Sequence, residues 1–147
     1  MGLYNKIKYF LFSILAKKTL GVRALIIENN QVLLIKHTYQ PGWCTIGGGV
    51  KAGETPAEAI CRELKEEVGA MLKESPKLFA VYHDGYKKYD DYIIFYLVGK
   101  CEYQEVKSWE IKDKKWFSLQ ALPLDISPAT LRRVEEYLGK AKISDRW

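Results

Sequence analysis

The sequence has only three cysteines, and none of them belongs to a C-x-x-C pair. Cys44, Cys61 and Cys101 are too few and too scattered to form a disulfide framework or a zinc site. Such sparse cysteine usage is typical of proteins in a reducing compartment, so we expect a cytoplasmic protein.

Long apolar runs are also absent. The N-terminal run Tyr9–Ala16 is far shorter than the roughly 20 residues that a membrane span needs. The pair Lys17-Lys18 follows it, where a signal peptide would carry small residues. We predict that residues 1–20 are an N-terminal extension that forms a helix, packed on the domain or on a partner copy. Weak contact of residues 6–18 with a membrane surface is the alternative, and an export signal is less favoured.

Charge of one sign does not dominate. The net charge is +5, and no run of five or more basic residues forms a nucleic-acid-binding arm. We therefore expect a small-molecule partner rather than a nucleic acid, and a monomer or a homodimer. A length of 147 residues suits one domain, which we place at residues 21–147.

Short runs of branched apolar residues predict several strands. Residues 21–28 and 31–36 form a predicted hairpin, because Asn29-Asn30 between them tolerates positive φ. Further strands are predicted at residues 44–46, 77–83, 92–99 and 115–118. A last helix is predicted from Ser127-Pro128 to Gly139, with Arg132-Arg133 on its solvent side. This order predicts an α/β (α+β) sandwich.

The central helix has clear signals at both ends. Thr55 is a predicted N-cap, Pro56 takes the first helical position, and Glu58 completes a capping box. Gly69 stands where a C-cap glycine belongs. Apolar residues recur at spacings of three and four and predict the buried stripe Ala57, Ile60, Cys61, Leu64 and Val68.

Three glutamates lie close together on the same helix. Glu63, Glu66 and Glu67 are three and four residues apart, so their like charges repel. A shared divalent cation relieves this repulsion, and carboxylate oxygens suit Mg²⁺, with Mn²⁺ as a substitute. Taken alone, the cluster is more typical of a solvated acidic face than of a metal site.

The residues around this cluster follow a longer pattern. From Gly48 to Ala70 the chain reads GGVKAGETPAEAICRELKEEVGA. The spacing is Gly48, five residues, Glu54, seven residues and then Arg62-Glu63. Leu64, Glu66, Glu67 and Gly69 complete the pattern. This segment resembles the Nudix box, G-x5-E-x7-R-E-U-x-E-E-x-G-U, in which U is a bulky aliphatic residue. Ala70 is smaller than the usual last residue, and Ile46 stands where the family usually has proline.

The resemblance implies a three-layer α/β/α sandwich with a mixed sheet, in which the box forms a loop–helix–loop. It also implies hydrolysis of a nucleoside diphosphate linked to another group. Glu66 and Glu67 would be the main metal ligands, with Glu63 as a ligand or water-activating base and the Gly47 carbonyl completing the set. Gly48, Glu54 and Gly69 would be structural.

Two further roles concern catalysis. Arg62 is expected to orient the glutamates through charge-assisted hydrogen bonds rather than to touch the substrate. Many Nudix members need another acid from a later loop, and Glu110 is our choice because it precedes Trp116 by six residues. Glu102 and Glu105 are its rivals.

The substrate-binding residues are predicted from weaker signals. Basic side chains on the first hairpin could meet phosphate, and aromatic side chains near the box could stack on a base. The candidates are Arg23, Lys36, His37, Tyr39 and Tyr82.

The preferred function is Mg²⁺-dependent hydrolysis of a nucleotide sugar or an ADP-ribose type of compound. A nucleoside-triphosphate pyrophosphatase or an RNA 5′-end pyrophosphohydrolase is the alternative within the family. A catalytically silent nucleotide-binding Nudix module is the alternative from another class.

Overall fold

The computed structural model of the protein describes residue 7 and residues 18–85 and 90–147. The predicted N-terminal helix and most of the predicted membrane-contact segment therefore lie outside the described residues. The first strand begins at Lys18, three residues before the predicted domain boundary at position 21. Among the described residues, no helix has the length and apolar composition needed to cross a membrane.

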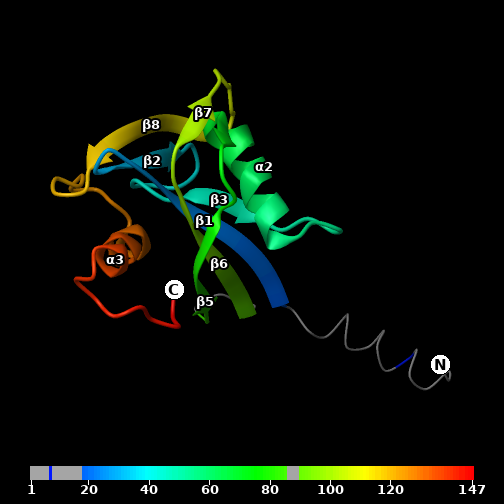
Figure 1. Ribbon diagram of the computed structural model, residues 1–147. Helices are drawn as coiled ribbons and strands as arrows, with labels where there is room; N and C mark the ends of the chain where they lie inside the picture. Colours follow the sequence, from blue (N-terminus) through cyan, green and yellow to red (C-terminus); the bar gives the residue numbers. More distant parts are fainter. Residues whose placement is uncertain (1–6, 8–17, 86–89) are drawn as a thin grey trace.

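A mixed sheet forms the centre of the molecule (Figure 1). Its strands follow the order β5-β6-β1-β2-β8, and β3 pairs with β1 off this path. The β1–β6 pair is parallel, whereas the other pairs in this sheet are antiparallel. The strands are β1 (Lys18–Glu28), β2 (Gln31–His37), β3 (Ile46–Gly49), β5 (Lys77–Asp84), β6 (Asp90–Val98) and β8 (Ile111–Ser118).

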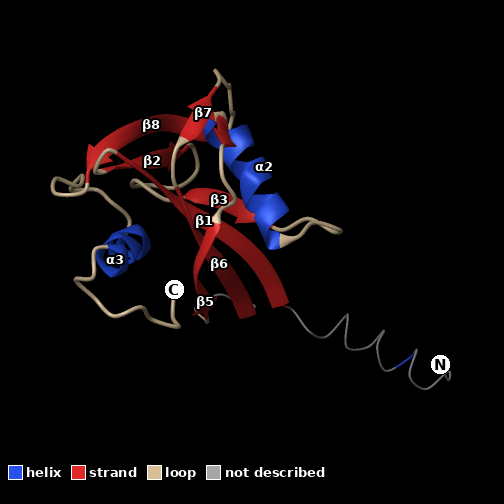
Figure 2. Cartoon of the chain, in the orientation of Figure 1, coloured by secondary structure: helices blue, strands red, loops and turns tan. Residues whose placement is uncertain are grey.

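The two described helices lie on opposite sides of this sheet (Figure 2). Successive residues of a strand point to opposite faces. Val22 and Ala24 of β1 therefore pack in the core with α2 (Pro56–Val68), and Leu25 packs in the core with α3 (Pro128–Tyr137). The predicted three-layer α/β/α sandwich with a mixed sheet is confirmed.

Local sequence signals account for the hairpin and the central helix. Asn29 and Asn30 have φ of 48° and 60°, as the predicted two-residue turn requires. Thr55 and Glu58 form the capping box, and Gly69 ends α2 in the left-handed conformation with φ of 73°. The box therefore adopts the predicted loop–helix–loop.

Other expectations need correction. The buried face of α2 includes Ala59 and Glu67, whereas the predicted Ala57 is exposed. Two short strands, β4 (Ala70–Leu72) and β7 (Cys101–Tyr103), pair with each other and were not predicted. Arg133 was placed on the solvent side of the last helix, but its side chain is fully buried.

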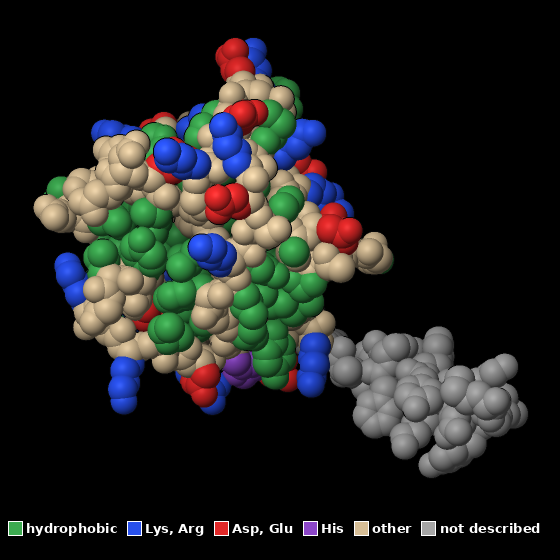
Figure 3. Space-filling view, in the orientation of Figure 1, with side chains coloured by type: hydrophobic (Ala, Val, Ile, Leu, Met, Phe, Trp, Pro, Cys, Tyr) green, Lys and Arg blue, Asp and Glu red, His purple; other side chains and the backbone are tan. Residues whose placement is uncertain are grey.

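The sheet keeps an uncovered apolar area. Leu20, Leu78 and Val81 retain 42, 64 and 49% of their surface exposed. Figure 3 shows hydrophobic side chains gathered over the part of the surface where β5 and the start of β1 lie. The helix α2 therefore covers only part of its face of the sheet.

Candidate active site

Arg62 holds the acidic side chains of the box in place. Its guanidinium donates to Glu54 at 2.6 Å, to Glu63 at 2.6 Å and to Glu66 at 3.2 Å. It also donates to the Gly49 carbonyl at 3.0 Å, which connects the helix to the end of β3. These charge-assisted bonds raise the pKa of Arg62 and lower the pKa of Glu54 to about 2. Arg62 thus bonds the box glutamates directly, and its orienting role in catalysis stays a prediction.

Glu67 lies on the buried side of α2, with only 6% of its surface exposed. Its carboxylate accepts a hydrogen bond of 2.9 Å from the Gly47 N–H. Burial raises the pKa of Glu67 to about 7, assisted by the charges of Glu63 and Glu110 and opposed by the Gly47 hydrogen bond and Arg23. The side chain is therefore fixed against the strand β3.

Glu63 lies directly against the backbone of Gly48. A Cβ atom at position 48 would lie 2.6 Å from a carboxylate oxygen of Glu63. A side chain larger than hydrogen at position 48 would therefore require the Glu63 carboxylate to shift. Gly69 is similarly restricted, because it combines its positive φ with close contact to the backbone of Gln104.

The loop between β7 and β8 faces these glutamates. It brings Glu110 to a cavity of about 400 Å³ that is also lined by Glu63, Glu66 and Glu67. The Glu110 carbonyl accepts a hydrogen bond of 2.9 Å from the Thr38 N–H, which anchors the loop to the end of β2. Glu102 and Glu105 do not line this cavity, and Glu102 pairs with Lys73 at 3.0 Å.

The carboxylates suit a divalent cation, although they are not arranged as a finished metal site. Within residues 18–85 and 90–147, no three Asp, Glu, His or Cys side chains converge closely enough to hold a metal ion. Arg62 engages one oxygen each of Glu63 and Glu66, so the second oxygen of each is not bonded to Arg62. The donor set of carboxylates beside a backbone carbonyl fits Mg²⁺.

Arg23 connects the box to the other face of the sheet. Its guanidinium donates to the Gly47 carbonyl at 2.8 Å, the same oxygen that the resemblance implies as a metal ligand. Arg23 also lines a cavity of about 230 Å³ on the side of α3. His37 and Thr130 lie in the same cavity. Arg23 thus lines the second cavity and is linked to the acidic cavity through Gly47, whose N–H donates to Glu67.

His37 and Tyr39 lie beside Arg23. The His37 ring is 4% exposed and stacks on the exposed Tyr39 ring with centroids 4.9 Å apart. Burial and the Arg23 charge lower the pKa of His37, whereas a backbone hydrogen bond to Glu110 and the Glu110 charge oppose this shift. Its Nδ1 has no hydrogen-bond partner among the described residues.

Comparison with known proteins agrees with this geometry. The family model of the NUDIX domain matches residues 17–138. The chain belongs to the Nudix family. It is a Nudix hydrolase, and the intact box residues occupy the positions described above.

The Nudix relatives differ in the share of their length that aligns with this chain. The chain is 30% identical over 125 residues to a Bacillus subtilis (strain 168) protein named as a candidate 8-oxo-dGTP diphosphatase, covering 84% of this chain and 83% of that protein. It is 48% identical over 61 residues to an RNA pyrophosphohydrolase of Psychromonas ingrahamii, covering 41% of this chain and only 33% of that protein. The crystal structure of a MutT NUDIX hydrolase from Burkholderia pseudomallei superposes with a TM-score of 0.70 at 30% identity, covering 80% of this chain and 96% of that chain.

Two of the predicted substrate contacts do not fit this Nudix structure. Tyr82 is fully buried, and its hydroxyl donates to Glu136 at 2.5 Å, so it belongs to the core. Lys36 forms an ion pair with Asp125 at 2.7 Å and lies over the Trp43 ring, which directs it away from the box. Neither contact can be predicted from alternation along β5 or β2, because Glu136 and Asp125 are distant in the sequence from Tyr82 and Lys36.

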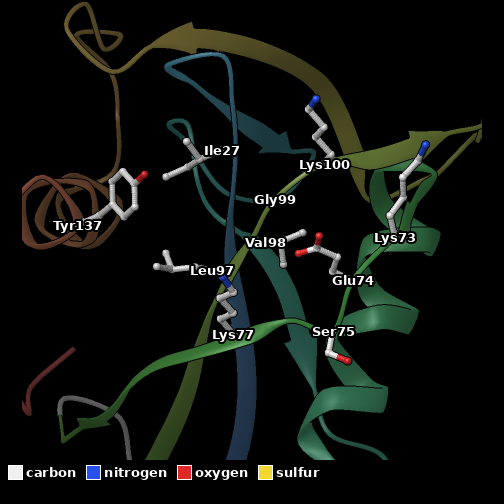
Figure 4. A pocket seen from close by; sticks show the side chains of 10 residues that line it. All are labelled: Ile27, Lys73, Glu74, Ser75, Lys77, Leu97, Val98, Gly99, Lys100 and Tyr137. Atoms are coloured by element: carbon white, nitrogen blue, oxygen red, sulfur yellow. The ribbon is translucent and has the colours of Figure 1, made fainter.

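A third cavity of about 380 Å³ lies at the opposite end of β5 (Figure 4). Lys77 lines this cavity, whereas Asp84 at the other end of β5 lines the cavity that contains Arg23. The third cavity contains no residue of the Nudix box. The candidate active site is therefore the cavity lined by Glu63, Glu66 and Glu67. The cavity that contains Arg23 also has no box residue, but the Arg23 guanidinium bonds the Gly47 carbonyl next to the box.

Sequence reasoning missed several residues that line the cavity next to Arg23. They come from the loop before β3, the start of α3 and the last residue of the sequence, and are Gln40, Thr45, Ser127, Thr130 and Trp147. No local pattern marks them, because only the fold brings these segments together.

Proposed function

We propose that this Nudix hydrolase is a Mg²⁺-dependent pyrophosphohydrolase that cleaves a phosphoanhydride bond of a nucleoside diphosphate linked to a further group. The observation that carries the proposal is the shared cavity of Glu63, Glu66, Glu67 and Glu110 beside the cavity that contains Arg23. The first cavity supplies anionic oxygen ligands, and the second offers room for the nucleoside end of a substrate.

Glu66, Glu67 and the Gly47 carbonyl would hold the cation, with Glu63 as a further ligand or as the base. A bound Mg²⁺ neutralises the diphosphate and lowers the pKa of a coordinated water molecule. Release of the Gly47 carbonyl from Arg23 would free that guanidinium to pair with a phosphate oxygen.

Glu110 would orient the attacking water from the side opposite to α2. A water molecule must approach the phosphorus in line with the leaving oxygen, and the helix supplies carboxylates from one side only. Glu110 lines the same cavity from the facing loop. Arg62 would keep the carboxylates of Glu63 and Glu66 in position throughout the reaction.

The group linked to the nucleoside diphosphate defines the substrate class. The preferred substrate remains a nucleotide sugar or an ADP-ribose type of compound. A nucleoside triphosphate is the second candidate, and the match to the Bacillus subtilis relative over 83% of that protein's length favours it. The RNA pyrophosphohydrolase match covers a third of that protein and gives weaker support to an RNA substrate. A cytoplasmic location also remains a prediction.

A substrate panel tests this function. The purified chain is incubated with Mg²⁺ and nucleotide sugars, ADP-ribose, dinucleoside polyphosphates or nucleoside triphosphates, and the products are identified by ³¹P NMR. We expect cleavage within the phosphoanhydride chain of at least one class. Absence of cleavage across the panel, with the Glu67→Gln chain as the blank, would contradict the proposal.

A further inference from the structure

The segment that ends in Trp147 is attached to the end of β5. The His83 N–H donates to the Asp145 carbonyl at 2.8 Å, and the Trp147 N–H donates to the His83 carbonyl at 3.1 Å. The side chains of Arg146 and His83 also contact each other at 2.8 Å. Backbone and side-chain bonds thus fix the path of residues 145–147.

A buried ion pair holds the same segment from the side of α3. The fully buried Arg133 contacts Glu136 at 3.0 Å and donates to the Arg146 carbonyl at 3.3 Å. Glu136 in turn accepts from the Ser144 N–H at 2.9 Å and from the Tyr82 hydroxyl. Each buried charge is therefore met by several partners, which is the condition for a buried pair to be tolerated.

The Arg133 guanidinium also lies between two aromatic rings. It is 3.9 Å from the Tyr82 ring centroid and 5.1 Å from that of Trp147. The Trp147 ring makes further contacts with Tyr82 at 5.6 Å and with Phe95 at 5.9 Å. Because all these neighbours are fixed in the core, the indole has a defined position.

Trp147 also lines the cavity that contains Arg23 and His37. It is the one large aromatic side chain among the described residues that line this cavity. A planar ring at a cavity wall stacks on a nucleobase, and this interaction tolerates different bases because every base has a π-face. The neighbouring Arg23 lies toward the acidic cavity, where the phosphates would be.

We propose that Trp147 is a specificity-determining residue that contacts the nucleobase of the substrate in the cavity beside Arg23. This inference rests on the proposed function, since it assigns one end of the same substrate. Stacking on an aromatic side chain changes affinity by roughly 5- to 100-fold. We therefore expect Trp147 to favour substrates with a base over substrates that lack one.

The test compares Trp147→Phe with Trp147→Leu. Both replacements fill the space against Phe95 with apolar atoms, but only phenylalanine offers a ring for stacking. Calorimetric titration without Mg²⁺ uses the four ribonucleoside monophosphates, with inorganic phosphate as the base-free probe. We expect Trp147→Leu to weaken binding of the best monophosphate by roughly tenfold or more, and Trp147→Phe by less than about threefold. Phosphate affinity should not change.

Phe79→Ala provides the matched control. Phe79 contacts Phe95, as Trp147 does, but it does not line the cavity. We expect this variant to melt at a lower temperature while its monophosphate affinity stays unchanged. Equal weakening in Phe79→Ala, unchanged binding in Trp147→Leu, or no monophosphate binding by the unmodified chain would overturn the inference. Monophosphate binding without hydrolysis of any panel substrate would instead contradict the proposed function alone.

Discussion

At the scale of single residues, Arg62 explains how the box helix tolerates its acidic cluster. Glu63 and Glu66 are close in sequence and would repel each other on an isolated helix. One guanidinium with several donors bonds both carboxylates and that of Glu54 at distances between 2.6 and 3.2 Å. Lysine offers a point charge instead of a planar fork, so it would not replace Arg62.

Glu110 provides a prediction at the same scale. Since Glu110 lines the acidic cavity, we expect Glu110→Gln to lower the catalytic rate by roughly tenfold or more, about 1.4 kcal/mol of barrier. Single-turnover measurements at saturating substrate give this rate directly.

Glu102→Gln and Glu105→Gln are the controls for Glu110, because neither residue lines the cavity. Both should retain nearly the full rate. Equal small effects in all three variants would show that the second acid comes from elsewhere, and a large loss in Glu105→Gln alone would assign the role to that residue.

Some residues of the site follow from the sequence, and others do not. The fixed spacing of the box brings Arg62 to Glu54, Glu63 and Glu66, and Glu110 lines the same cavity as Glu63 and Glu66, while the catalytic roles of Arg62 and Glu110 stay predictions. The burial of Glu67, Tyr82 and Arg133 was not predicted, because polar side chains are usually exposed. Glu67 and Tyr82 are buried with partners from other elements, which leave no local signal in the sequence. Arg133 pairs with Glu136 in its own helix and also donates to the distant Arg146 carbonyl.

At the scale of elements, the close packing of β3 on α2 fixes the register between the box loop and the helix. We expect Gly48→Ala to lower turnover by roughly tenfold or more, because its Cβ would displace the Glu63 carboxylate. Gly49→Ala is the matched control, since a Cβ at that position would meet no atom within 4 Å.

Steady-state kinetics and thermal melting distinguish the two glycine variants. The Gly49→Ala chain should keep its turnover and its melting temperature. Similar turnover in both variants would mean that the contact between Gly48 and Glu63 does not position the carboxylate for catalysis.

The elements themselves were predictable where the signals are local. The capping residues of α2 and the Asn29-Asn30 turn predicted a helix and a hairpin that the structure confirms. The strands β4 and β7 escaped prediction because each has three residues and pairs with a distant partner. The cavity that contains Arg23 could not be predicted either, because its lining residues come from distant parts of the sequence.

At the scale of the whole molecule, the Glu54–Arg62 pair links stability to pH. The pKa of Glu54 is lowered to about 2 by hydrogen bonds from Arg62 and the Lys51 N–H. A carboxyl group with a lowered folded-state pKa stabilises the fold above its unfolded pKa, about 4.5, and loses this effect as the pH falls toward 2.

We therefore expect the difference in melting temperature between the unmodified chain and Glu54→Gln to be largest above about pH 5 and to shrink as the pH falls toward 2. Calorimetry across this range measures it. Glu74→Gln serves as the control, since Glu74 has no Arg62 contact. A Glu54→Gln difference that is constant with pH would show that the ion pair does not contribute to folding stability.

The two cavities assigned to the proposed reaction are lined by elements from opposite faces of the sheet. The acidic cavity contains residues of α2 and of the loop before β8, and the cavity beside Arg23 contains residues of α3 and of the C-terminal segment. Arg23 reaches the Gly47 carbonyl between them. A nucleotide substrate would thus extend from one face toward the other, around the strand β3.

The Mg²⁺ dependence of turnover is the most direct test of whether Glu66 and Glu67 hold a catalytic cation. Hydrolysis of the best panel substrate is measured with Mg²⁺, with EDTA, and with Mg²⁺ in the Glu66→Gln and Glu67→Gln chains. Both variants should keep their fold. Glutamine at position 67 can still accept the Gly47 hydrogen bond, and Glu66 is exposed. The account predicts no turnover in EDTA, recovery on adding Mg²⁺, and a loss of about 100-fold or more, near 3 kcal/mol, in both variants. Full turnover in EDTA, or near-normal turnover in a folded variant, would contradict it.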